Sequence, residues 1–156
     1  MKRATMLLRL SLTIGCWIAM SPIADAASGL FVVNQPWVRP AAAGGSTEAY
    51  MNLSSGDGAA LVSVKSAAAR KATLSGAGAT PVQEISLPPG ALVRLAPGKQ
   101  RISLRRLAKG LRLGDSLALT LVFRTADGAQ KEIPVIAVAR LRSPIDDERR
   151  AHRHSR

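Results

Sequence analysis

Side chains that could hold a soft metal are almost absent from this chain of 156 residues. The only cysteine is Cys16, and the only histidines are His152 and His154. Of the four methionines, only Met51 lies beyond residue 20. Thiolate, imidazole and thioether groups are the ligands that select Cu(I) and related metals. A soft-metal site in the body of the chain would depend on Met51, and a single methionine is more typical of a flexible filler in a hydrophobic core.

The histidines near the C-terminus are weak candidates for metal binding. They form the sequence His152-Arg153-His154 inside the charged segment 143–156. This segment has too few apolar residues to offset the entropy of ordering it, so we predict a disordered basic tail. Two imidazoles on such a segment lack the supporting contacts of a preorganised metal site. Loose binding of Cu(II), Ni(II) or Zn(II) is the most that we expect from them.

The remaining residues offer no arrangement typical of catalysis. Residues 1–151 contain no histidine that could act as a base, and the only cysteine lies in the N-terminal segment. Most of the aspartates and glutamates are scattered among expected turns, and no glycine-rich phosphate loop is visible. Because a nucleophile, base and charge stabiliser cannot be assembled from these residues, we predict that the protein is not an enzyme.

The first 26 residues have the order of a secretory signal peptide. Lys2 and Arg3 give a positive start, an apolar stretch follows at about 6–20, and Ala24-Asp25-Ala26 is a small-x-small cleavage site. We predict cleavage after Ala26 and a periplasmic or secreted protein. The mature chain would contain no cysteine, so its fold would be held by packing alone.

Two alternatives to cleavage remain for this segment. A membrane anchor is disfavoured because the apolar run is shorter than the roughly 20 residues of a spanning helix, and Pro22 interrupts it. No stable membrane span is therefore expected after cleavage. Lipidation at Cys16 is the other alternative, although Thr13 is a poor residue for a lipidation motif.

The chain is strongly basic, with a formal net charge of +12. Such a charge often indicates nucleic-acid binding. The predicted export and the small number of aromatic side chains argue against a base-stacking surface here. An acidic partner protein or an anionic envelope surface fits better, and the plainer alternative is an arginine-rich proteome.

Residues 27–142 are expected to form one all-β domain. The clearest evidence is 116–124, where Leu117, Leu119, Leu121 and Phe123 alternate with other residues and would share one face of a strand. Eight or nine short strands separated by turns every 8–12 residues are typical of a β-sandwich or barrel. The expected strands and extended segments are 30–33, 36–40, 47–53, 60–64, 71–75, 82–87, 91–95, 101–107, 116–124 and 131–138.

Five short motifs follow one another along this domain. They are PWVR at 36–39, TEAYM at 47–51, LAPG at 95–98, LGD with LTLVF at 113–123, and EIPV at 132–135. Over about 33–138 they resemble the motifs of one family, the periplasmic PCu(A)C copper chaperones. The resemblance implies a cupredoxin-like Greek-key β-sandwich and delivery of Cu(I) to the CuA site of cytochrome c oxidase.

The same resemblance identifies where the copper ligands of the family would fall. The family uses a histidine after one strand, a methionine further on, and a His-x-Met pair after a Pro-Gly turn. These positions are occupied here by Ser75, Ala79, Arg101 and Ser103, and a further common methionine falls on Arg105. Copper is therefore implied only by the family, and no cofactor is expected in the core.

A basic cluster surrounds the last of these positions. Arg101 and Arg105 would share a strand face with Ser103, and Arg106 follows directly. Because arginine matches carboxylate and phosphate groups well, these three arginines are candidates for an anion-binding or partner-binding site. The alternative is a charged strand face that only keeps the protein soluble.

Overall fold

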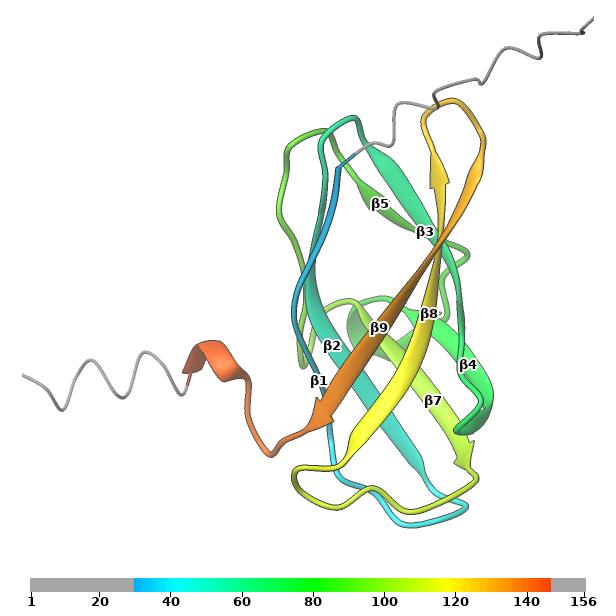
Figure 1. The fold of residues 1–156 in the computed structure, drawn as a ribbon, viewed down its shortest axis with the longest axis vertical. Helices are drawn as coiled ribbons and strands as arrows, with labels where there is room; N and C mark the ends of the chain where they lie inside the picture. Colours follow the sequence, from blue (N-terminus) through cyan, green and yellow to red (C-terminus); the bar gives the residue numbers. More distant parts are fainter. Residues whose placement is uncertain (1–29, 147–156) are drawn as a thin grey trace, which may run out of the picture.

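The structure, a computed structural model, describes residues 30–146 (Figure 1). The predicted signal peptide with Cys16, and the tail residues His152 and His154, lie outside the described residues. Nine strands form one sheet in the order β4-β7-β2-β1-β9-β8-β3-β5, and β6 pairs with β2. The strands are β1 Phe31–Val38, β2 Ser46–Ser55, β3 Ala59–Lys65, β4 Ala69–Ser75, β5 Ile85–Leu87, β6 Val93–Leu95, β7 Arg101–Leu107, β8 Ser116–Thr125 and β9 Gln130–Ala139.

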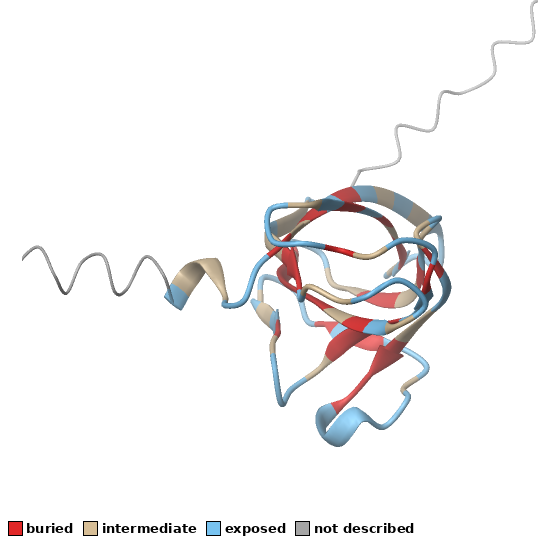
Figure 2. Ribbon diagram, turned by 90° about the horizontal axis from the view of Figure 1, so that it is seen from below, coloured by how far each residue is buried: buried red, intermediate tan, exposed pale blue. Residues whose placement is uncertain are grey.

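The sheet curves into a barrel whose inner side is apolar, which confirms the all-β prediction. Buried residues lie along the inner side of the strands around this barrel (Figure 2). In β8, Leu117, Leu119, Leu121 and Phe123 are all 2% exposed or less. Alternation along the strand therefore directs these side chains to one continuous core, as the sequence predicts.

The hairpin between β8 and β9 forms at the predicted Asp127-Gly128 turn. The Thr125 amide donates a hydrogen bond to the Ala129 carbonyl over 2.9 Å, and Gly128 has a φ of 86°. Glycine adopts this left-handed conformation without a steric penalty from a Cβ atom. The local sequence therefore determines this pairing, which continues from Ser116 opposite Val138 to Arg124 opposite Gln130.

Strand β1 is longer than the sequence indicates. The expected segments 30–33 and 36–40 are one strand, in which the register with β2 shifts between Asn34 and Trp37. Gln35 has a φ of 51° at this irregularity. A bulge of this kind accommodates Pro36, which cannot donate to a regular ladder.

The segment after β3 and the segment after β9 contain more regular structure than the sequence predicts. Strand β4 begins at Ala69, earlier than the expected 71–75, and the short 3-10 turn η1, Ala77–Ala79, follows it. At the other end, residues 144–146 of the predicted tail are helical. No helix within residues 30–146 has the length and hydrophobicity needed to cross a membrane.

Candidate functional site

The outer face of β4, β7 and β2 brings the predicted site positions together. Ser103 in β7 pairs with Thr73 in β4 on one side and with Glu48 in β2 on the other. Arg101 pairs with Ser75 in β4. Because side chains alternate along a strand, positions 101, 103 and 105 point to the same side as 75 and 48. We call this surface the outer face.

Three of the four positions that the resemblance assigns to family ligands lie close together. Ser75 contacts Ser103, and Ser103 lines one pocket with Ala79. The Ser75 and Ser103 hydroxyl oxygens are 2.9 Å apart and share a hydrogen bond. Ala79, at the end of η1, lines the same open pocket of about 340 Å³ as Ser103. Ser75 itself is only 3% exposed, because Pro81 forms a β-bridge beside it. The structure therefore brings Ser75, Ala79 and Ser103 to one region of the surface.

Arg101 occupies the fourth position and is buried against an acidic residue. Its Nε lies 2.7 Å from Oε1 of Glu48, which makes an ion pair, although the N–H is not directed at that oxygen as a hydrogen bond requires. Its Nη1 donates to the Lys99 carbonyl over 3.0 Å. The side chain was expected to contribute to a basic surface, but the structure neutralises it because Glu48 lies on the neighbouring strand.

Glu48 also accepts a hydrogen bond from the hydroxyl of Tyr50. Burial, the hydrogen bond to Glu48 and its negative charge, in that order, raise the pKa of Tyr50 above its ordinary value. The ring of Tyr50 packs on Trp37 with centroids 4.5 Å apart, and the Arg39 guanidinium lies 5.7 Å from its centroid. The outer face thus contains a connected polar and aromatic network, which the sequence analysis did not identify.

The chemistry of this network does not fit Cu(I). Its hydroxyl and guanidinium groups are not the soft thioether and imidazole ligands that Cu(I) prefers. Met51 does not compensate, because it is 2% exposed, pairs with Leu95 of β6 and belongs to the hydrophobic core. Within residues 30–146, no three His, Cys, Asp or Glu side chains cluster as a metal site.

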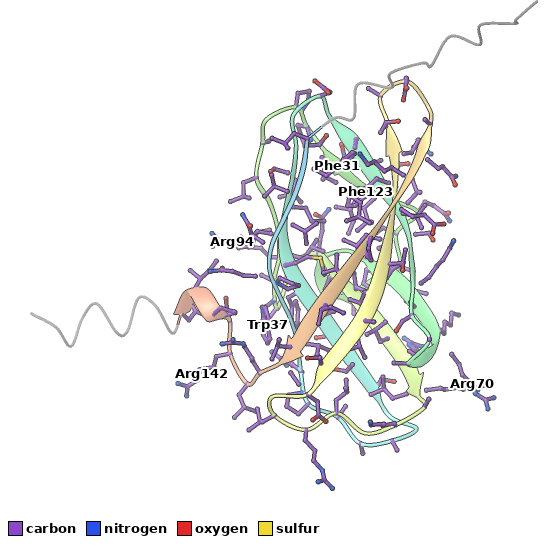
Figure 3. The ribbon with its side chains drawn as sticks, in the orientation of Figure 1. Phe31, Trp37, Arg70, Arg94, Phe123 and Arg142 are labelled. Carbon is purple, nitrogen blue, oxygen red and sulfur yellow. The ribbon has the colours of Figure 1, made fainter. Side chains whose placement is uncertain are left out.

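The other two predicted arginines, Arg105 and Arg106, are exposed. Consecutive strand residues normally point to opposite sides of a sheet. This alternation is interrupted at Arg106, which has a φ of 55°, and the pairing of β7 with β2 is irregular at the same place. Lys71 of β4 lies directly opposite Arg105 of β7. Arg70, which precedes Lys71 in β4, points away from the barrel (Figure 3). The sequence analysis missed both β4 residues because nothing in it indicated that β4 pairs with β7.

These side chains form a mainly cationic surface, which we call the basic surface, although Glu48 also lines the pocket between Arg39 and Arg105. Arg39 contributes to it because it lines the same pocket as Arg105. The ion pairs found among residues 30–146 include none of its members. Like charges directly opposite in a sheet are unfavourable, so Lys71 and Arg105 gain from a bound anion. The basic surface consists of Arg39, Arg70, Lys71, Arg105 and Arg106.

Comparisons with known proteins agree with this fold. The chain is similar to the apo PCuAC domain from PmoF1, with 30% identity, a TM-score of 0.62, and coverage of 72% of this chain and 94% of that domain. The copper-bound PCuAC domain from PmoF2 is 28% identical, with a TM-score of 0.58 and coverage of 72% and 95%. The solution structure of CuI-DR1885 from Deinococcus radiodurans shares the fold at 22% identity and a TM-score of 0.55, over 74% of this chain and 83% of that one.

Sequence comparison gives the same family. Among curated proteins, none matches the chain. A family model described as "Putative lipoprotein LpqE-like" matches residues 31–135. This match spans most of the described barrel, including every strand of the outer face. The chain therefore belongs to the LpqE-like, PCuAC family of copper chaperones and has their cupredoxin-like fold.

Proposed function

We propose that this protein is an exported member of the copper chaperone family that binds an acidic partner protein through its basic surface and does not carry Cu(I) at the family's ligand positions. One observation carries the proposal. The outer face is filled by a Ser75–Ser103 hydrogen bond and an Arg101–Glu48 ion pair, and it is bordered by cationic side chains. The proposal includes no catalytic activity and no delivery of copper to a CuA centre.

The side chains at Ser75, Arg101 and Ser103 are poor ligands for Cu(I). The oxygens of Ser75 and Ser103 are hard donors, whereas Cu(I) is held by soft sulfur and by imidazole nitrogen. Arg101 remains protonated at any physiological pH, so it cannot act as a ligand. Its guanidinium occupies this place on the outer face and pairs with the Glu48 carboxylate. Ser75 and Ser103 hydrogen-bond to each other, and Arg101 pairs with Glu48, so these groups already have partners within the protein.

The basic surface offers cationic groups that suit an acidic partner. The guanidinium groups of Arg39 and Arg105 border one pocket and can bind carboxylates with paired hydrogen bonds. A partner carboxylate would also relieve the repulsion between Lys71 and Arg105. A carboxylate-bearing protein segment therefore complements this surface better than a metal ion does.

A Cu(I) titration tests the first half of the proposal. The chain from residue 27 onward would be titrated under anaerobic reductant against a competing chelator, and we expect no tight binding. The combined variant Ser75→His, Ala79→Met, Arg101→His and Ser103→Met is the matched positive control. We expect it to gain Cu(I) binding, because it restores the family's ligand types at neighbouring positions.

Truncation before Ser143 separates the remaining explanations for any copper binding. Loss of binding on truncation would assign the metal to His152 and His154, making the protein a metal carrier through its tail. Tight one-to-one binding that survives truncation would contradict the proposal and direct attention to Met51.

A charge-reversal experiment tests the second half. We expect the variant Arg105→Glu/Arg106→Glu to weaken binding of a polyglutamate peptide at least about tenfold, since each arginine contributes a charge-assisted contact. The matched control is Arg140→Glu/Arg142→Glu, which makes the same change in net charge on a different part of the molecule. Equal losses in both variants would show that net charge alone explains the binding.

Export is tested by the N-terminus of the protein recovered from the cell envelope. Cleavage after Ala26 predicts an N-terminus at Ala27. The family description names a lipoprotein, which supports the alternative of lipidation at Cys16. Intact mass spectrometry distinguishes the two, because a lipidated chain would begin at Cys16 and carry acyl groups.

A further inference from the structure

A second surface lies where β8 begins and β9 ends, at the lower end of the barrel in Figure 1. Leu113 and Leu141 are 60% and 69% exposed, and both line one open depression of about 410 Å³ together with Val138. The Gly114 amide donates to the Ala139 carbonyl over 2.9 Å, which holds the two segments together. Ile136, at 57% exposed, lies two residues before Val138 on the outward side of β9.

Folding does not explain these exposed leucines. Leu113 is next to Gly114, whose φ of 85° suits the turn, and the turn itself does not require a leucine. Turn positions usually carry small polar residues for reasons of local hydrogen bonding. Large apolar side chains that gather on a surface mark a place of interaction.

Arginines surround this apolar surface. Arg140 and Arg142 line the same depression as the leucines, and Arg112 precedes Leu113 in the turn. The side chain of Arg142 extends away from the barrel (Figure 3). Asp115 is the acidic residue nearest in the turn, and its Oδ2 accepts a hydrogen bond from the Arg112 amide over 2.8 Å. We call Arg112, Leu113, Arg140, Leu141 and Arg142 the apolar–basic patch.

We propose that the apolar–basic patch binds the surface of an anionic lipid bilayer. Leu113 and Leu141 would enter the boundary between headgroups and acyl chains, while the three arginines would contact lipid phosphates. This inference does not depend on the proposed function, because it uses no residue of the basic surface.

Charge complementarity favours a bilayer over a second copy of the chain. In a two-fold symmetric dimer the same patch would face itself, which would bring the arginines of both copies together. Such like-charge contact is unfavourable, whereas a layer of phosphates compensates every arginine at once. An apolar centre with a cationic rim is the arrangement that surface-bound membrane proteins use.

Co-sedimentation with lipid vesicles tests the inference. The chain from residue 27 onward is used, because the apolar N-terminal segment would itself bind lipid. We expect binding to vesicles that contain phosphatidylglycerol and little binding to phosphatidylcholine vesicles. Raising the salt to about 0.5 M should weaken it by screening. The variants Leu113→Ser/Leu141→Ser and Arg140→Gln/Arg142→Gln should each lower the partition coefficient about tenfold.

The matched control is Arg105→Gln/Arg106→Gln, which removes the same charge from the basic surface and should change lipid binding much less than Arg140→Gln/Arg142→Gln. Equal loss in the two arginine variants, with no effect of the leucine changes, would overturn the inference in favour of non-specific attraction. Self-association that the leucine variant abolishes, without lipid binding, would also overturn it in favour of a dimer. The substituted side chains are exposed, so circular dichroism should confirm that each variant is folded.

Discussion

The inner side of β8 and the outer face beside β7 both contain buried side chains, but for different reasons. On β8, leucines and Phe123 fill the core through simple alternation along one strand. On β7, Arg101 is 7% exposed because Glu48 from β2 neutralises it, and Ser103 bonds to Ser75 from β4. The comparison shows that burial on β8 supports the fold, whereas burial at the outer face depends on polar partners from other strands.

This difference means that the fold does not depend on which polar residues occupy the outer face. The apolar interior requires only hydrophobic side chains of suitable volume, and β8 supplies them independently of the outer face. The outer face instead requires matched pairs, since an unpartnered buried charge or hydroxyl is costly. The Arg101–Glu48 ion pair is one such matched pair.

The largest expected effect comes from breaking the inner side. Phe123→Ala removes a fully buried ring that contacts Phe31 with centroids 4.8 Å apart. We expect a loss of about 4 kcal/mol in the free energy of unfolding, from lost transfer energy and the cavity left behind. Urea unfolding monitored by circular dichroism measures it. If Phe123→Ala lowered the free energy of unfolding less than Glu48→Gln does, the inner side would not be the more important region for stability.

A smaller effect is expected from breaking the outer face. Glu48→Gln leaves the guanidinium of Arg101 buried without a counter-charge, which should cost about 2 kcal/mol because Glu48 is itself partly exposed. The triple variant Glu48→Leu/Tyr50→Phe/Arg101→Leu is the control, because Tyr50 would otherwise lose its hydrogen-bond acceptor. We expect it to recover most of the stability, because an apolar cluster carries no desolvation penalty. A triple variant less stable than Glu48→Gln would show that the ion pair itself stabilises the fold.

The stability contributed by Tyr50 on the outer face is expected to depend on pH. The raised pKa of Tyr50 means that the folded protein keeps the phenol protonated where the unfolded chain loses the proton. Its contribution to stability is therefore complete below about pH 10 and is lost as the pH rises above that value. Tyr50→Phe should cost about 1 kcal/mol at neutral pH through the lost hydrogen bond to Glu48. It should also flatten the decline at alkaline pH, and an unchanged alkaline slope would refute the assignment.

The smallest effect is expected where the C-terminal segment meets the barrel. Ser143 and Ile145 line a small pocket of about 120 Å³ with Trp37, which is the only tryptophan after residue 26. Truncation before Ser143 should expose Trp37 and shift its fluorescence to longer wavelength, while stability changes by less than about 1 kcal/mol. Ile145→Ser in the full-length mature chain is the control, and we expect a smaller shift. No shift in either variant would mean that the segment does not shield the indole in solution.

Much of the outer face could not be predicted from the sequence. The positions Ser75, Arg101 and Ser103 were identified by resemblance, and their proximity depends on β4 pairing with β7. The neutralisation of Arg101 could not be predicted, because Glu48 lies more than fifty residues earlier in the chain. Lys71 was missed for the same reason, since its role follows from its place opposite Arg105.

The sequence alone determined the all-β class, most strand positions, the Asp127-Gly128 hairpin and the scarcity of soft metal ligands. These properties are local, because alternation, turn conformation and ligand chemistry depend on residue type and near neighbours. Only the tertiary structure decided which polar groups pair, which arginines remain exposed, and which leucines form a surface patch. Those properties depend on the register between strands distant in sequence, and a shift of one residue in that register reverses which side each residue faces.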